Sequence, residues 1–188
     1  MNRILRVDLS SRTWTTEELD EKLIRDYIGG RGFGAKLLYD DLKPGIDTYG
    51  EENEVIFIAG PLAATGAQSC ARFEIYFKSP QTGGYFQSSG GGFFAPEMKF
   101  AGYDAIIIKG KSEKPVYLWI HDDKVEFRDG AYLWGLGLAD TEQLIREELN
   151  DPYVRVAAIG PAGENLVKYA GVFSDRRAAA RGGGGAVM

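Results

Sequence analysis

Val55-Ile56-Phe57-Ile58-Ala59 is an apolar run that ends at the Gly60-Pro61 pair. A short apolar run that is rich in β-branched residues and bounded by a turn signal is typical of a buried β-strand. About a hundred residues later, Val154-Arg155-Val156-Ala157-Ala158-Ile159 is also β-rich and also runs into a Gly-Pro pair. The sequence therefore predicts the same strand ending at two places in the chain.

Similar elements precede both strands. Before the first strand we expect a hairpin in which residues 3–9 pair with a short strand around Trp14. Two helices should follow: one that begins at a capping box of Thr15 and Glu18, and a second over residues 33–42. The second strand is preceded by a hairpin at 116–120 and 125–127 and a helix that starts near Asp140. This order predicts one domain over residues 1–188 that contains a duplicated unit with pseudo-twofold symmetry, with repeats at roughly 3–80 and 115–175.

The segment between the two repeats adds strands at 72–77, 85–89 and 104–108 and a helical piece at 93–100. We count about ten strands and three or four flanking helices. Hairpins and turns join most of the strands, which favours antiparallel or mixed sheets. The predicted fold class is α+β, with two mixed or antiparallel β-sheets.

Composition excludes several classes of function. The net charge of −5 argues against a nucleic-acid-binding domain, which is usually basic. The single cysteine, Cys70, excludes an internal disulfide and a CxxC metal site, and it fits a reducing cytoplasm. The sequence starts with a strand-like pattern rather than a signal peptide, and it has no apolar run of the ~20 residues that span a bilayer. We expect a cytoplasmic protein with no membrane segment.

Three apparent motifs favour structural roles. His121 is the only histidine, and it lies beside two aspartates at an expected hairpin tip, where a solvated polar turn is expected. The sequence therefore argues against a hydrolase with a Ser-His-Asp or Cys-His catalytic site. Cys70 is interpreted as a loop or core residue. The glycines of residues 30–34 follow a helix rather than a strand, so we interpret them as a helix-to-helix turn and not as a dinucleotide loop.

Arginine and glycine carry the stronger signal. Glycine accounts for 25 residues, and the chain ends on Arg176-Arg177-Ala178-Ala179-Ala180-Arg181 followed by glycine at 182–185. Arginine forks match phosphate oxygens, and consecutive glycines let backbone N–H groups or a flat ring approach the main chain. A flexible basic tail is the alternative interpretation of this segment alone.

Arg72 and the Ser89-Gly90-Gly91-Gly92 turn add to this segment, because each joins a charge or a bare backbone to the end of an expected strand. Together they predict a polar, phosphate-bearing ligand that lies across a sheet face. The chain offers no nucleophile, base or redox group of its own, so such a site would leave the chemistry to a cofactor.

Several longer motifs resemble the N-terminal domain of the tungsten-containing aldehyde:ferredoxin oxidoreductases, and the resemblance covers essentially the whole chain. They are Ile4-Leu5-Arg6-Val7-Asp8-Leu9, Ala59-Gly60-Pro61-Leu62, Lys99-Phe100-Ala101-Gly102-Tyr103-Asp104-Ala105, Ala158-Ile159-Gly160-Pro161-Ala162-Gly163-Glu164-Asn165-Leu166 and Arg181-Gly182-Gly183-Gly184-Gly185-Ala186-Val187-Met188.

The resemblance implies a cofactor of two pyranopterin dithiolenes that hold tungsten or molybdenum, with a magnesium ion between their phosphates. It implies oxidation of an aldehyde to a carboxylic acid, with two electrons passing through a [4Fe-4S] cluster to ferredoxin. The cluster cysteines, further pterin motifs and the substrate pocket belong to later domains. We therefore expect this domain alone to be catalytically silent, with those downstream domains and ferredoxin as partners, and a homo-oligomer is possible.

The resemblance also implies site residues. Arg72 matches an arginine between pterin and cluster, and Gly91 matches a backbone contact to the cofactor. Residues that match the segment holding pterin and phosphate are Arg177, Ala178, Ala180 and Arg181. Ser89 and Ala178 match the positions whose main-chain oxygens hold magnesium. Many members carry Asn where this chain has Ser89, a change that a carbonyl role survives, and Ala180 replaces a glycine.

Two alternatives remain open at this point. The chain could be a stand-alone module that binds a pterin or another phosphorylated ligand. It could also belong to a branch of the same family that acts on an aromatic acyl-CoA, because the substrate contacts would lie elsewhere.

Overall fold

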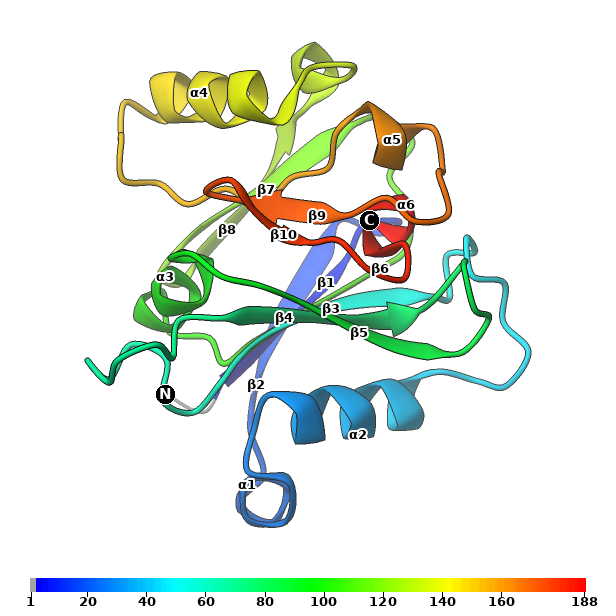
Figure 1. Cartoon of the computed structure of the whole chain (residues 1–188), viewed down its shortest axis with the longest axis vertical. Coiled ribbons are helices and arrows are strands. Elements are labelled where there is room, and N and C mark those ends of the chain that lie inside the picture. Colours follow the sequence, from blue (N-terminus) through cyan, green and yellow to red (C-terminus); the bar gives the residue numbers. More distant parts are fainter. Residues whose placement is uncertain (1–2) are drawn as a thin grey trace.

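The computed structural model describes residues 3–188, and Figure 1 shows its arrangement. Its largest element is a mixed sheet of six strands in the order β2-β1-β6-β3-β4-β5. The strands are β1 (Arg3–Asp8), β2 (Thr13–Glu18), β3 (Glu54–Ala59), β4 (Phe73–Lys78), β5 (Tyr85–Gly90) and β6 (Ala105–Lys109). β1 runs parallel to β6, whereas the other neighbours are antiparallel.

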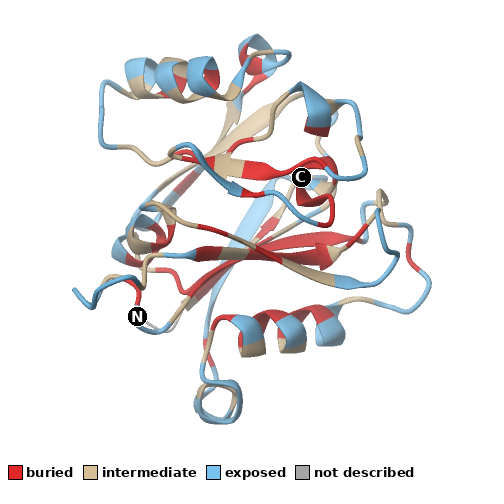
Figure 2. Ribbon diagram, in the orientation of Figure 1, coloured by how far each residue is buried: buried red, intermediate tan, exposed pale blue. Residues whose placement is uncertain are grey.

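The centre of this sheet is buried on both faces. All six residues of β3 are buried, as the apolar run predicts, and Figure 2 shows the central strands in the colour of buried residues. Alternate side chains point to opposite faces: Ile56 and Ile58 pack with Leu37 and Leu38 of α2, whereas Phe57 packs with Phe73 of β4 on the other face.

Two helices precede β3. α1 (Glu21–Tyr27) begins at the N-cap Asp20, whose carboxylate accepts the N–H of Lys22 at 3.2 Å. α2 (Arg31–Asp41) follows directly and covers one face of the sheet with Phe33, Leu37 and Leu38. The short α3 (Phe94–Phe100) lies between β5 and β6 on the opposite face, where Phe94 packs 5.5 Å from Phe57 between ring centroids.

The second half of the chain covers the face opposite α2. It contains a hairpin of β7 (Val116–His121) and β8 (Lys124–Asp129), the 3₁₀ turn η1 (Ala131–Leu133), α4 (Leu138–Leu149), α5 (Pro161–Glu164), a hairpin of β9 (Val172–Ser174) and β10 (Arg177–Ala179), and α6 (Gly184–Val187). The two hairpins form two-stranded sheets, and Figure 1 shows α4 on the outer side of this half.

The predicted α+β class with mixed sheets is confirmed. Two local predictions were wrong. Thr15 and Glu18 lie in β2, opposite β1, instead of opening a helix. Residues 154–159 form only one bridge in the described chain, Ala158 with Phe173, rather than a full strand. The pseudo-twofold relation of the two repeats stays a prediction.

Candidate functional site

The predicted ligand residues come together where β4 begins and β5 ends. In the β4–β5 register Phe73 is opposite Gly90, which places Arg72 opposite Gly91. The Arg72 guanidinium lies 3.5 Å from the Ser89 hydroxyl oxygen. The neighbouring Glu74 carboxylate accepts hydrogen bonds from the Tyr76 hydroxyl and from Gln87 instead of pairing with Arg72.

β10 brings the C-terminal segment to the same place. The N–H of Arg181 donates to the Ser88 hydroxyl at 3.1 Å, and the Ala179 nitrogen would lie 3.3 Å from a Cβ built on Gly90. Arg177 and Ala178 pair with Ser174 and Phe173 across the hairpin. Residues a hundred positions apart in the sequence therefore lie on one surface.

The turn that carries Arg177 is held in an unusual conformation. Asp175 and Arg176 both have positive φ values, 49° and 60°, as a two-residue turn of type I′ requires. The Asp175 carboxylate fixes the turn, because it accepts the N–H of Phe93 at 3.3 Å and the guanidinium groups of Arg155 at 3.1 Å and Arg146 at 3.4 Å. Such strain in a non-glycine residue persists only where neighbouring contacts enforce it, and it is frequent at functional sites.

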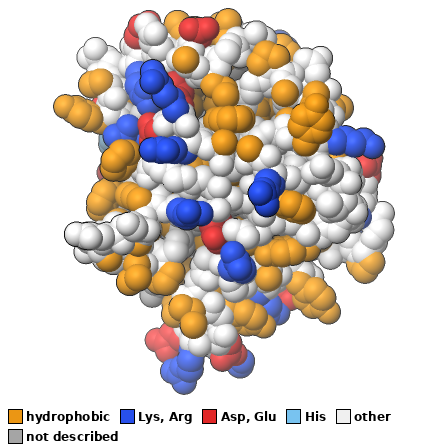
Figure 3. All heavy atoms as spheres, in the orientation of Figure 1, with side chains coloured by type: hydrophobic (Ala, Val, Ile, Leu, Met, Phe, Trp, Pro, Cys, Tyr) orange, Lys and Arg blue, Asp and Glu red, His pale blue; other side chains and the backbone are white. Residues whose placement is uncertain are grey.

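The site is cationic, and its positive charges are free to bind an anionic ligand. Arg72, Arg177 and Arg181 are exposed, and none of them forms an ion pair with another residue of 3–188. Figure 3 shows separate Lys and Arg side chains on the face where β4, β5 and β10 lie. Three unpaired guanidinium groups around one patch of main chain suit an anionic ligand, although the whole protein is acidic.

Gly91 differs from the other glycines of the site. A Cβ at Gly91 would meet only the Arg177 side chain at 3.8 and 3.9 Å, which is ordinary contact, and its φ is compatible with any residue. A Cβ at Gly90 would instead lie 2.5 Å from the Phe73 ring, and Gly92 has a φ of +96°. The fold therefore requires glycine at 90 and 92 but not at 91, where the bare backbone remains open to a ligand.

The terminal glycine run packs inside the fold, and its predicted contact with a ligand stays a prediction. Residues 182–185 are buried, so the alternative of a flexible tail is wrong. A Cβ on Gly182 would lie 2.3 Å from the Phe86 ring, one on Gly183 2.1 Å from the Lys168 carbonyl oxygen, and one on Gly185 2.3 Å from the Gly171 carbonyl oxygen. These glycines let the chain pack against β4, β5 and residues 168–171, and they thereby fix the position of Arg181.

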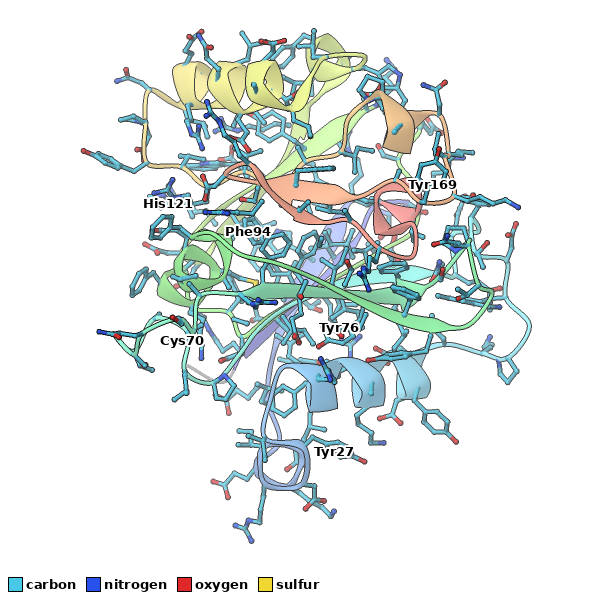
Figure 4. The ribbon with its side chains drawn as sticks, in the orientation of Figure 1. Tyr27, Cys70, Tyr76, Phe94, His121 and Tyr169 are labelled. Atoms are coloured by element: carbon cyan, nitrogen blue, oxygen red, sulfur yellow. The ribbon has the colours of Figure 1, made fainter. Side chains whose placement is uncertain are left out.

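The residues interpreted as structural have local contacts. Figure 4 labels His121 and Cys70. His121 is exposed at the end of β7 and stacks on Trp119. Cys70 donates to the carbonyl oxygens of Leu62 and Ala67 within its loop. Gly29 and Gly30 join α1 to α2, whereas Gly32 and Gly34 lie within α2, so the predicted helix-to-helix turn is confirmed only at Gly30.

The structure places all the predicted residues on this surface. Ser89 is half-buried, whereas Ala178 and Ala180 are exposed. Sequence reasoning missed Asp175, Arg146 and Arg155, which hold the hairpin turn. An aspartate directly after a short apolar strand was the available signal, because Asp tolerates a left-handed turn.

The described residues 3–188 contain no group of three or more His, Cys, Asp or Glu side chains placed to hold a metal ion. None of their helices is long and apolar enough to cross a membrane.

Comparisons with known proteins relate the chain to one family. Residues 4–188 match the profile of a family described as aldehyde ferredoxin oxidoreductase, N-terminal domain. The chain is 46% identical to the tungsten-containing aldehyde ferredoxin oxidoreductase of Pyrococcus furiosus, over 99% of this chain and 31% of that protein. It is 35% identical to the WOR-like subunit of an aliphatic sulfonate oxidoreductase of the same organism, over 99% of this chain and 32% of that protein.

A solved structure is similar over the full chain. It is the active site complex BamBC of benzoyl coenzyme A reductase in complex with 1,5 dienoyl-CoA, with a TM-score of 0.98 and 46% sequence identity. The match covers 100% of this chain and 29% of that one. The chain thus spans about a third of the length of the relatives that it matches.

Proposed function

We propose that this chain, which belongs to the aldehyde ferredoxin oxidoreductase family as its N-terminal domain, forms the base on which a tungsten bis-pyranopterin cofactor rests. The observation that carries the proposal is the surface of unpaired arginines around the open backbone of Gly91. The Pyrococcus furiosus relative is named as a tungsten-containing enzyme, which supports tungsten as the metal of the cofactor. Molybdenum is the alternative.

The residues present fit such a cofactor. Arg72, Arg177 and Arg181 would contact its phosphates and the polar edges of its rings, because planar guanidinium groups bind phosphate through two parallel hydrogen bonds. Gly91, Ala178 and Ala180 have no or short side chains, so a flat ring system can approach their main chain.

A magnesium ion bound with the cofactor would be held by the carbonyl oxygens of Ser89 and Ala178. Gly90 and Ala179, the residues that follow them, lie next to each other where β5 meets β10. Carbonyl and phosphate oxygens are the hard ligands that Mg²⁺ prefers. A backbone donor does not depend on side-chain identity, so Ser89 suits this role as well as an asparagine would.

The residues of this domain bind and orient rather than react. When bound, the cofactor supplies the two-electron redox chemistry that converts an aldehyde to a carboxylic acid. The strained Asp175–Arg176 turn and the buried glycines of 182–185 hold Arg177 and Arg181 in place before binding, which reduces the entropy lost on binding. Arg72 would place a permanent positive charge beside the bound cofactor.

The remaining parts of the reaction belong to further domains of a longer enzyme. A [4Fe-4S] cluster, the aldehyde pocket and the surface for ferredoxin would lie there, in the cytoplasm, and the isolated domain would be catalytically silent. The length of the relatives, about three times that of this chain, favours this arrangement over a stand-alone ligand-binding module.

The experiment changes Arg72 to Ala in the longer native protein, with Arg25→Ala on the exposed surface of α1 as the matched control. We expect Arg72→Ala to lower tungsten content or the rate of ferredoxin reduction at least about tenfold, the effect of losing one strong charged contact. Stability should change by less than ~0.5 kcal/mol, because Arg72 is exposed and unpaired. Normal metal content and activity in Arg72→Ala would remove this residue from the site.

A second candidate function keeps the site and changes the substrate. The 46% identity and the TM-score of 0.98 to the benzoyl-CoA reductase complex favour an aromatic acyl-CoA as this alternative. Assaying the purified enzyme with aldehydes and with an aromatic acyl-CoA under matched conditions separates the two. Turnover of the thioester alone would overturn aldehyde oxidation while leaving the cofactor site intact.

A further inference from the structure

An acidic side chain, Glu74, adjoins the arginine of the proposed site. Arg72 and Glu74 are two positions apart at the start of β4, so their side chains lie on the same face of the sheet. Glu74 is directly opposite Ser89 in the β4–β5 register, and the Arg72 guanidinium lies 3.5 Å from the Ser89 hydroxyl oxygen. A carboxylate and a guanidinium of opposite charge therefore adjoin the same serine.

The Glu74 carboxylate is nevertheless bound to two other donors. One of its oxygens accepts a hydrogen bond from the Tyr76 hydroxyl, and the other accepts one from the Gln87 side-chain amide at 3.0 Å. Tyr76 and Gln87 are opposite each other, as the next cross-strand pair on the same face. Both donors are neutral, whereas an arginine usually forms a stronger hydrogen bond with a carboxylate. Glu74 thus uses the weaker donors.

Packing against α2 fixes the position of Tyr76. Its side chain is fully buried in the apolar cluster that contains Phe33 and Leu37 of α2, and Figure 4 labels it between the β4–β5 hairpin and that helix. A Cβ built on Gly34 would lie 2.4 Å from the Tyr76 ring, so the ring lies directly against the helix. Burial and the hydrogen bond to Glu74 raise the pKa of Tyr76, so its hydroxyl stays protonated and donates.

The start of α2 also favours the observed position of the Glu74 carboxylate. Gly30 is the N-cap of this helix of 11 residues, and a Glu74 oxygen lies 3.4 Å from a Cβ built on Gly30. Free N–H groups and the helix dipole make the N-terminus of a helix favourable for a negative charge. Glu74 is therefore held on three sides, by α2, Tyr76 and Gln87.

These contacts leave the charge of Arg72 unneutralised. Arg72 is exposed, and the Ser89 hydroxyl beside it carries no charge. Residues two positions apart in a strand are about 7 Å apart, a distance that the long side chains of Arg and Glu can bridge. A released Glu74 carboxylate would therefore form an ion pair with Arg72 and occupy the guanidinium that an anionic ligand needs.

We propose that Tyr76 and Gln87 are positioning residues that hold the Glu74 carboxylate away from Arg72, so that the Arg72 guanidinium remains free for the anionic cofactor. The inference rests on the proposed function, because it acts through Arg72. None of the three residues of this network needs to contact the cofactor itself.

The size of the effect follows from how often Arg72 would be occupied. Where the binding-competent form is only a fraction of the molecules, the apparent affinity falls by that fraction. An ion pair with Glu74 in about nine of ten molecules would lower the apparent affinity about tenfold. The loss has an upper limit, because occupying Arg72 cannot weaken binding more than Arg72→Ala does.

The test removes both donors in the longer native protein by combining Tyr76→Phe with Gln87→Met. Tyr76→Phe keeps the ring that packs against α2, and methionine is similar in size to glutamine. We expect the double variant to retain about 5- to 10-fold less tungsten or molybdenum than the parent by elemental analysis. Tyr85→Phe, the same change at an exposed tyrosine of that face, is the matched control and should leave the metal content unchanged.

Adding Glu74→Gln to the double variant distinguishes positioning from packing. We expect it to restore the metal content to within about twofold of the parent, because a neutral amide forms no ion pair with Arg72. A loss of metal that Glu74→Gln does not restore would overturn the inference, and so would full metal content in the double variant. Normal metal content in Arg72→Ala would overturn the proposed function as well, whereas loss in Arg72→Ala without loss in the double variant overturns this inference alone.

A crystal structure of the double variant without cofactor gives a readout that does not depend on metal loading. We expect an Arg72 nitrogen within about 4 Å of a Glu74 oxygen, the distance of an ion pair. Gln87→Met alone replaces the double variant if that variant does not fold, because Gln87 is only half-buried, and the same pair should then form in part of the molecules. An Arg72 that is unpaired with Glu74 in these crystals contradicts the inference.

Discussion

Replacing Gly91 with Ala should affect the stability of the fold and the binding of the cofactor in opposite directions. The new Cβ would lie 3.8 and 3.9 Å from the Arg177 side chain, and the φ of Gly91 is compatible with alanine. At such a position Gly→Ala stabilises a protein by about 0.4–1 kcal/mol, chiefly by restricting the unfolded chain. For a domain of this size we expect an increase in melting temperature of about 1–4 °C.

The same methyl group would occupy space that the proposed cofactor needs. Overpacking a close contact costs about 1–3 kcal/mol, which corresponds to a loss of affinity of about 5- to 150-fold. We expect the variant of the longer protein to contain correspondingly less tungsten or molybdenum by elemental analysis. Gly84→Ala is the matched control, because a Cβ there would meet nothing within 4 Å and Gly84 lies in the exposed β4–β5 turn. Full metal content in Gly91→Ala would refute the backbone contact, and an unfolded variant would refute the reasoning about stability.

Three further predictions concern stability. Glu54 is 5% exposed, and its burial, with the nearby Asp41, raises its pKa from 4.5 to about 7. A raised carboxyl pKa favours folding below pH 4.5 and loses that contribution as the pH rises through 7, so Glu54→Gln should match the parent at pH 4 and exceed it by ~3 kcal/mol at pH 8 in urea unfolding. Gly182→Ala should lower the melting temperature by at least about 6 °C, because its φ is +75° and the new Cβ would overlap the Phe86 ring; a melting temperature within 1 °C of the parent contradicts the packing role. Asp175→Ala should cost about 2 kcal/mol and speed amide exchange of Phe93, since charged hydrogen bonds are lost; unchanged exchange would show that the turn is held by other contacts.

The apolar strands were the part of the fold that the sequence predicts well. The runs at 55–58 and 104–108 form β3 and β6, because burial on both faces leaves a largely continuous apolar pattern, and the alternating run at 72–77 forms β4. The hairpin β9–β10 was missed, since three-residue strands that contain Arg and Ala carry no alternation. The polar β2 was read partly as a helix start, because Thr15 and Glu18 match a capping box that pairing with β1 overrides.

The sequence singles out the residues proposed for the site, but it does not predict their arrangement. Arg72, the turn after Ser89 and Arg177 each stood out by charge or by glycine content. That they share one surface follows from the β4–β5 register and from the packing of β10 beside β5, which are non-local contacts. Sequence alone also could not separate Gly91, which the fold does not require, from Gly182, which packs against an aromatic ring.

In the proposed function, the metal cofactor rests on the surface formed by Gly91, Arg72 and Arg177. The most direct measurement is an anomalous difference map from crystals of the longer protein, recorded on both sides of the tungsten absorption edge, with the molybdenum edge as the second setting. We expect a single strong peak beside the β5–β10 surface, with ring density between that peak and the main chain of Gly91. A peak bound elsewhere, or crystals of active enzyme with no peak at either edge, would contradict it.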